Sequence, residues 1–184
     1  MRSPNQLQRH VEPLISVAGV PLTARRNQPP SGVVLDRQSF VQSRVRHYYW
    51  EKDLNCATTD LLILAETFGV GLSGQVMDAA LGMHGAGSYG AQCGLVEGTL
   101  MFLGIFGRRR GIPDTAIVDG CKAFAAAFER RFASLRCDVL RPEGFAAENP
   151  PHLCEQLTCQ AIGFNIEYVG RMIGKLESAH PLAR

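Results

Sequence analysis

Six cysteines are the residues of this chain whose type and spacing could do chemistry. Four of them, Cys56, Cys93, Cys137 and Cys154, each stand at the predicted start of a helix. Unpaired backbone N–H groups and the positive end of the helix dipole gather there, and both favour a thiolate over a thiol by lowering the pKa. Because thiolates attack electrophiles and bind metals, the sequence predicts that these four cysteines form one reactive or metal-binding site.

Neighbouring residues indicate where these helices start. Asn55, a favourable capping residue, comes directly before Cys56. Pro150 and Pro151 are typical of a first helical turn and come shortly before Cys154. These signals place both sulfurs in first turns of helices.

The two remaining cysteines are predicted to be outside this site. Cys121 falls on the apolar stripe of its helix, where a free cysteine behaves as a small buried hydrophobe. Cys159 follows Cys154 by five residues, which places it about 140° around the helix. We therefore expect that Cys154 and Cys159 do not belong to the same site.

The order of the cysteines resembles that of a known family, C_GCAxxG_C_C. The segment Cys93-Gly94-Leu95-Val96-Glu97-Gly98 looks like its central motif, with Leu95 where the motif has alanine. The rest of the pattern agrees in order: Asn55-Cys56-Ala57 upstream, a glycine-rich stretch from Gly82 to Gly90, and the later Cys137 and Cys154. The resemblance covers about residues 36–175.

The resemblance implies redox activity, because members of this family are called redox-active on the strength of their cysteines. A related domain in split-Soret cytochromes accompanies an iron–sulfur-type centre. No haem is expected here, because the chain has no Cys-x-x-Cys-His. The resemblance thus implies either an iron–sulfur cluster held by the four cysteines or a dithiol–disulfide couple, and with either an electron-transfer or thiol partner. The alternative is a non-catalytic helical assembly protein whose cysteines are structural.

Three glycines near Cys93, namely Gly90, Gly94 and Gly98, are candidate cofactor-binding residues. They would let backbone N–H groups approach a cluster sulfide or a thiolate. Glycine inside a helix costs about 1 kcal/mol relative to alanine, so Gly94 and Gly98 are also predicted to lie against another backbone.

Three other polar residues accompany the cysteines. His84 could be a fourth ligand or a proton carrier, although a lone histidine is more often a surface or capping residue, and the same holds for His152. Glu97 lies in an otherwise apolar helix, so it should pair with a donor or have a raised pKa.

Helical periodicity runs through nearly the whole chain after residue 35. Apolar residues recur at helical spacing, and no stretch alternates as a strand would. The sequence predicts an all-α fold, a single compact bundle of five to six helices with an extended N-terminal arm. The arm is residues 1–34 and the cysteine-containing helical domain residues 35–184. Helices are expected over 36–50, 55–68, 73–83, 93–106, 113–132 and 149–172, with a short one at 137.

The arm differs chemically from the rest. Residues 1–50 carry seven arginines and two acidic residues, a net charge of +5, whereas the remainder carries −3. Prolines interrupt the arm, yet it contains apolar residues that could pack: Leu7, Val11, Leu14, Ile15, Val17, Val20 and Leu22. We expect the arm to pack across a partner subunit in a homo-oligomer, a dimer. The alternative is an extension, disordered or folded back on its own chain.

Several function classes are disfavoured. The basic residues are too sparse and too poor in aromatics for a nucleic-acid partner. The longest apolar run, 95–106, is too short for a membrane span and contains Glu97. No secretory signal is evident, which favours the cytoplasm and argues against a disulfide framework.

Overall fold

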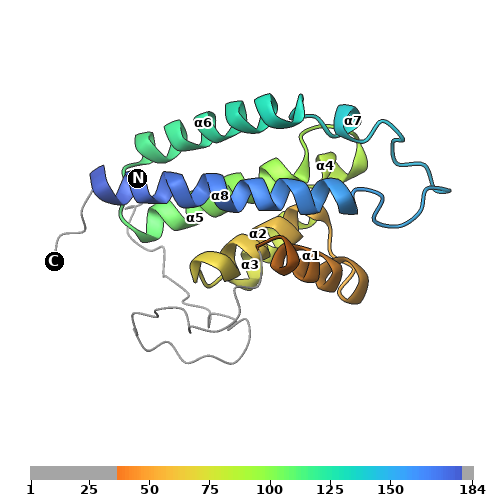
Figure 1. Cartoon of the computed structure of the whole chain (residues 1–184), viewed down its shortest axis with the longest axis horizontal. Coiled ribbons are helices and arrows are strands. Elements are labelled where there is room, and N and C mark those ends of the chain that lie inside the picture. The colour runs from red at the N-terminus through yellow and green to blue at the C-terminus, as the bar shows by residue number, and fades with distance from the viewer. Residues whose placement is uncertain (1–36, 180–184) are drawn as a thin grey trace, which may run out of the picture.

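Helices make up most of the computed structural model, which describes residues 37–179 and their side chains as far as residue 175 (Figure 1). Within that range no strand forms, and an antiparallel bridge joins Gln92 to Arg136. The all-α prediction is confirmed. The arm, residues 1–34, lies outside the described residues, so its predicted packing stays a prediction.

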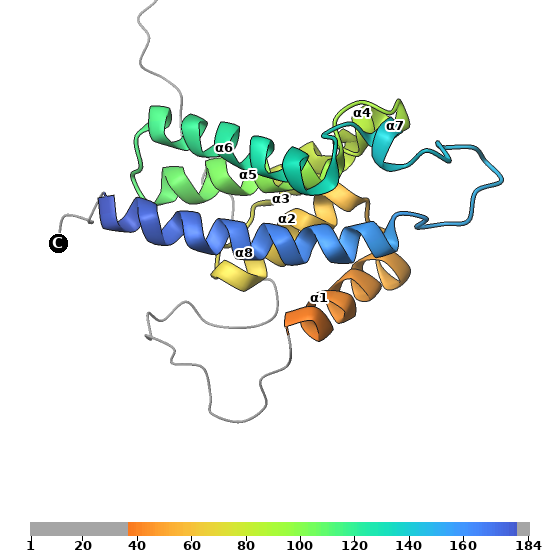
Figure 2. The same ribbon diagram turned by 45° about the horizontal axis from the view of Figure 1, so that its top comes forward.

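The elements follow the predicted order closely. They are α1 (Arg37–Arg46), η1 (His47–Glu51), α2 (Cys56–Phe68), α3 (Gly74–Ala79), η2 (Ala80–Gly82), α4 (Gly85–Ser88), α5 (Gly94–Arg109), α6 (Asp114–Phe132), α7 (Cys137–Leu140) and α8 (Glu155–Ala179). The longer helices α1, α2, α5, α6 and α8 form the bundle, and short ones connect them at its ends (Figure 2).

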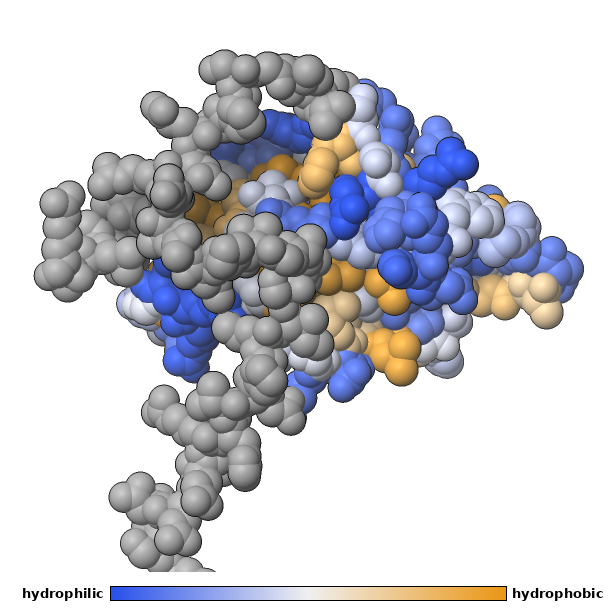
Figure 3. Space-filling model, turned by 90° about the horizontal axis from the view of Figure 1, so that it is seen from below, coloured by the Kyte–Doolittle hydropathy of each residue, from blue (hydrophilic) through white to orange (hydrophobic). Residues whose placement is uncertain are grey.

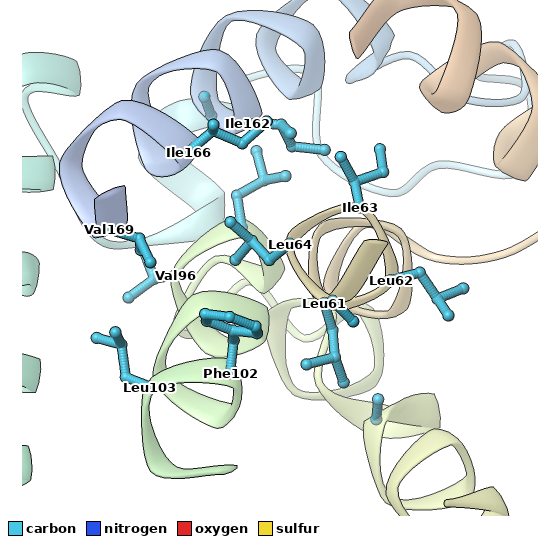
Figure 4. Packing of buried hydrophobic residues seen from close by; sticks show 14 of the residues in the cluster. Leu61, Leu62, Ile63, Leu64, Val96, Phe102, Leu103, Ile162, Ile166 and Val169 are labelled. Carbon is cyan, nitrogen blue, oxygen red and sulfur yellow. The ribbon is translucent and has the colours of Figure 1, made fainter. Parts of the chain in front are cut away.

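Helix α2 lies at the centre of the bundle, since every residue from Ala57 to Ala65 is buried, the polar ones included. Leu61, Leu62, Ile63 and Leu64 point to different sides of the helix, and all four are buried (Figure 4). Asn55 caps its start, since the amide oxygen accepts the Thr58 N–H at 2.9 Å, and Gly69 ends it in the left-handed conformation.

Helices α5 and α8 close over α2 to form the core. Val96, Phe102 and Leu103 from α5 meet Ile162 and Val169 from α8 (Figure 4). On one face of the molecule, hydrophilic and hydrophobic residues are interspersed over the part that the structure describes (Figure 3). None of the helices within residues 37–179 combines the length and apolar character that a membrane span requires.

A short pairing of two segments of the chain, around Gln92 and Arg136, fixes the end of the bundle where the cysteines lie. Beside the Gln92–Arg136 bridge, the Cys93 N–H donates to the Leu135 carbonyl at 2.8 Å, and the Cys137 N–H donates to the Ala91 carbonyl at 2.7 Å. Because α5 and α7 both begin at this contact, it sets the positions of their first residues relative to each other.

Candidate functional site

A cavity of about 160 Å³ lies where α2, α7 and the start of α8 meet. Cys56, Cys137 and Cys154 line it together with both histidines considered above, His84 and His152. Cys56 and Cys137 are the first residues of α2 and α7, Cys93 caps α5, and Cys154 directly precedes α8. The predicted placement of all four cysteines at helix starts is therefore confirmed.

Cys93 joins this group through Cys137. The Cys93 thiol donates a hydrogen bond to the sulfur of Cys137. The antiparallel bridge explains the contact: each cysteine follows a bridge residue, Gln92 or Arg136, by one position, so both side chains leave the paired segments on the same face. The structure thus brings the four predicted cysteines together, while their chemical role stays a prediction.

The four thiols differ in acidity. The hydrogen bond from Cys93, together with the positive charge of Arg141, lowers the pKa of Cys137 to about 7. The same hydrogen bond and burial raise the pKa of Cys93. Burial, followed by the negative charges of Cys137 and Cys154, raises the pKa of Cys56 to about 12. Cys137 therefore has the lowest pKa of the four thiols.

The prediction that every helix start lowers its thiol pKa is wrong for three of the four cysteines. Burial also raises the pKa of Cys154, although Arg141 opposes it. The loss of hydration destabilises a buried thiolate more than the helix N-terminus stabilises it, and neighbouring thiolates repel one another. Only Cys137, with a hydrogen-bond donor and a nearby cation, has the lowered pKa that was expected.

Two of the three predicted glycines lie where α5 crosses α2. A Cβ on Gly94 would stand 2.5 Å from the Cys56 sulfur, and one on Gly98 would stand 2.5 Å from the Ala57 carbonyl oxygen. The packing prediction for both is confirmed. Gly90, with φ +96°, lies instead against Asp138 of α7. A cofactor-binding role for the three stays a prediction.

Sequence reasoning missed Arg141, which lines the cavity beside the sulfurs. Its Nη1 lies 4.0 Å from the Cys154 sulfur, and its guanidinium stacks over the Phe145 ring at 4.4 Å. A cation at this place favours thiolates in the cavity. A basic residue one turn after Cys137 was the available signal, since positions i and i+4 of a helix face the same side.

Sequence reasoning also missed Asp60, a fully buried acid on α2. Thr99 Oγ1 donates to its Oδ2 at 2.7 Å, and Asn165 Nδ2 donates to its Oδ1 at 3.0 Å. Burial raises its pKa to about 7, although both hydrogen bonds act in the opposite direction. Glu97, the acid that the sequence did single out, is only partly buried, and burial raises its pKa as expected.

Both His84 and His152 line the cavity. His84 Nδ1 is buried without a hydrogen-bond partner. The His152 ring stacks on Tyr49 at 4.6 Å, and its Nε2 lies 3.5 Å from Asp53 Oδ1. His152 is therefore held by contacts with Tyr49 and Asp53, whereas the Nδ1 atom of His84 has no hydrogen-bond partner beside the thiols.

Cys121 and Cys159 do not line this cavity. Cys121 packs against the core from α6 and is partly rather than fully buried. Cys159 lines a separate cavity of about 970 Å³ between α1 and α8. The expected division of the cysteines agrees with these positions.

Over residues 37–179, no group of three or more His, Cys, Asp or Glu side chains is arranged to hold a metal ion. The number and type of thiol donors suit an iron–sulfur cluster, but their arrangement does not, since the Cys93 thiol is hydrogen-bonded to the Cys137 sulfur.

A family model described as "Putative redox-active protein (C_GCAxxG_C_C)" matches residues 54–168, a stretch that contains all six cysteines. Neither the curated proteins nor the solved structures contain a match to this chain.

Proposed function

Because the chain belongs to the C_GCAxxG_C_C family of redox-active proteins, we propose that Cys93 and Cys137 form a dithiol–disulfide couple. The hydrogen bond between the two thiols is the observation that carries this proposal. It supplies what such a couple needs: an activated thiolate and a second thiol in contact with it.

The expected reaction is the reduction of a disulfide substrate. The Cys137 thiolate attacks one sulfur of the substrate, forms a mixed disulfide and releases a substrate thiolate. Cys93 then attacks the Cys137 sulfur, and its proton leaves with the second substrate sulfur. The substrate gains two electrons and the protein holds a Cys93–Cys137 disulfide, which a dithiol reductant returns to the starting state. Arg141 offsets the negative charge on Cys137 before the attack.

Disulfide mapping tests this proposal. Titration of the full chain with a mild oxidant, followed by peptide mass spectrometry, should give one intramolecular disulfide, between Cys93 and Cys137. Cys137→Ser should abolish it, and Cys121→Ser should leave it unchanged. Absence of any disulfide, or a bond between other cysteines, contradicts the proposal.

An iron–sulfur cluster is the second candidate, because three thiols line one cavity and the fourth, that of Cys93, contacts one of them. Such a group would supply one-electron transfer, and it requires Cys93 and Cys137 to separate from each other. Iron analysis and visible absorption of anaerobically purified protein distinguish the candidates. Iron that is lost in Cys56→Ser and Cys154→Ser, but retained in Cys121→Ser, would favour the cluster, whereas colourless, iron-free protein would remove it.

The remaining alternative, an assembly protein with inert cysteines, makes a different prediction for thiol labelling. Exposed thiols of low pKa react with iodoacetamide near neutral pH, and buried ones of raised pKa do not. Cys137 is only 4% exposed, but it lines the cavity and has the lowered pKa, so we expect it to react first. If no cysteine of the native protein reacts, the structural alternative holds.

A further inference from the structure

The cysteine-lined cavity has two polar atoms that the proposed couple leaves without a partner. They are Nδ1 of His84 and Nε of Arg141, two residues that line the cavity together with Cys137. Both atoms are buried, and neither has a hydrogen-bond partner among the described residues. Because a buried polar group without a partner is unfavourable, two such groups at one cavity indicate a bound molecule that forms the missing hydrogen bonds.

The contacts of Arg141 place its guanidinium at this cavity. Its Nη1 lies 4.0 Å from the Cys154 sulfur, and its Cζ lies 4.4 Å from the centre of the Phe145 ring. Cys154 and Phe145 both line the cavity. The Arg141 N–H also donates to the Cys137 carbonyl at 2.8 Å, so the two residues are one helical turn apart. A molecule held by Arg141 is therefore close to the residue that the proposed function makes the attacking thiol.

The size of the cavity limits what can bind there. Its volume is about 160 Å³. Pockets that hold drug-sized ligands are larger, from about 300 to about 1,000 Å³. Cys137 is only 4% exposed, so a reactant must enter the cavity to reach its sulfur. The cavity therefore suits a molecule with few non-hydrogen atoms.

The chemistry of the lining selects among small oxidants. The Nε–H of Arg141 is a donor that needs a good acceptor, and sulfur accepts hydrogen bonds only weakly. Among the described residues that line the cavity, Arg141 alone carries a charge that does not depend on pH. Since that charge balances one thiolate, a neutral molecule leaves no unpaired charge in the cavity. A hydroperoxide is small and neutral, and its oxygens accept hydrogen bonds.

We propose that this cavity binds hydrogen peroxide or a small alkyl hydroperoxide, and that the Cys93–Cys137 couple reduces it. This second activity rests on the proposed function, because it uses the same two thiols. Arg141 Nε donates a hydrogen bond to the peroxide, and His84 Nδ1 forms the other one. The two unpartnered atoms thus hold the substrate beside Cys137.

The reaction has two steps. The Cys137 thiolate attacks one peroxide oxygen, so that an S–O bond forms and the O–O bond breaks. The other oxygen takes a proton from solvent and leaves as water or an alcohol. Cys93 then attacks the sulfur of the resulting sulfenic acid, and the hydroxyl group leaves as water with the Cys93 proton. The peroxide has gained two electrons, and a dithiol reductant converts the Cys93–Cys137 disulfide back to two thiols.

The rate of Cys137 oxidation by hydrogen peroxide, divided by its rate of methylation by iodomethane, tests the role of Arg141. Both reactions need the thiolate, but iodomethane has no atom that accepts a strong hydrogen bond. Arg141→Lys keeps the positive charge and loses the Nε donor, so this ratio should fall by about tenfold or more. Arg136→Lys is the matched control, because Arg136 is exposed and pairs with Asp138. It should keep the wild-type ratio.

Cys93→Ser tests the chemical step. Serine can still donate a hydrogen bond to Cys137, but it forms no disulfide. Hydrogen peroxide should therefore leave a sulfenic acid on Cys137 of this variant, which dimedone traps for mass spectrometry. The wild type should give the Cys93–Cys137 disulfide instead. In both proteins Cys121 should be oxidised more slowly than Cys137 by about tenfold or more.

The outcomes separate the inference from the proposed function. If diamide forms the Cys93–Cys137 disulfide but hydrogen peroxide oxidises Cys137 no faster than Cys121, the inference alone is overturned. An unchanged rate ratio in Arg141→Lys also overturns it alone. If neither oxidant forms the disulfide, the function and the inference both fail.

Selectivity of the wild type decides the question if Arg141→Lys does not fold. Cumene hydroperoxide carries an aromatic ring that is too large for the cavity. Relative to hydrogen peroxide, it should therefore react with Cys137 at least about tenfold less well than it does with Cys121, which lies outside the cavity. Equal relative rates at the two cysteines would overturn the inference.

Discussion

Gly94 of α5 lies so close to Cys56 of α2 that a Cβ on the glycine would stand 2.5 Å from the sulfur. The same Cβ would stand 2.9 Å from the backbone nitrogen of Ala57. Since backbone cannot move aside cheaply, we expect Gly94→Ala to lower the free energy of unfolding by about 1–3 kcal/mol, despite the better helix propensity of alanine. Urea denaturation followed by circular dichroism measures this change.

Gly104→Ala is the control in the same helix. Nothing lies within 4 Å of a Cβ at Gly104, so alanine there should raise the free energy of unfolding by up to about 1 kcal/mol. If the two variants changed stability in the same direction, the close crossing of α2 and α5 would be contradicted.

Cys93→Ala should make Cys137 less acidic. The hydrogen bond from the Cys93 thiol is the largest cause of the lowered Cys137 pKa, so its loss should move that pKa from about 7 towards the ordinary value of 9.0. At pH 7 such an increase would reduce the thiolate fraction of Cys137 from about one half to about one hundredth. Rates of Cys137 alkylation across pH, followed by mass spectrometry, give the midpoint. Cys121→Ala should leave the midpoint in place, and an unmoved midpoint in Cys93→Ala would show that another group activates Cys137.

Asp60 should make the folded protein less stable as the pH rises from about 4 to about 7. Burial raises its pKa from 3.8 to about 7, so over this interval the folded state keeps a proton that the unfolded state has lost. Its contribution is therefore fully present below pH 3.8 and is lost as the pH approaches 7, by up to about 4 kcal/mol.

Urea midpoints of the wild type and Asp60→Asn between these pH values test this expectation. The variant has no such group and should show the weaker decrease. Cys137 does not contribute to this pH dependence, because a thiol with a lowered pKa stabilises the folded protein only as the pH rises beyond about 7. Parallel curves for the two proteins would mean that Asp60 is ionised throughout.

The sequence predicted the helices and their caps because those signals are local. Asn55 caps α2 and Gly69 ends it, and both effects depend on a few neighbouring residues. The grouping of the four cysteines could also be anticipated, since a shared family pattern accompanied their positions. Their acidities could not, because burial and the Cys93–Cys137 contact depend on how distant segments meet.

Two features of the site could not be predicted from the types of the residues involved. Asp60 precedes the apolar run 61–65, which predicts a buried helix without showing that the acid is buried with it. The glycine-rich segment predicts a loop, but the structure has positive φ at Ala86 and Ser88 as well as at Gly85 and Gly87. Alanine and serine avoid that conformation, so only tertiary contacts could impose it here.

The N-terminal arm should determine the oligomeric state. Its charge of opposite sign to the remainder gives only a weak, salt-screened attraction over about 8 Å, so apolar burial must supply most of any contact. The arm carries apolar residues such as Leu14, Ile15 and Leu22, which are too many for a solvated tail. Prolines such as Pro13 and Pro21 prevent an independent helix. We therefore propose a homodimer in which the arm packs on the partner subunit. Deletion of residues 2–34 should convert the dimer to a monomer, which light scattering measures. A deletion variant that is still a dimer, or a wild type that is a monomer, would contradict the proposal.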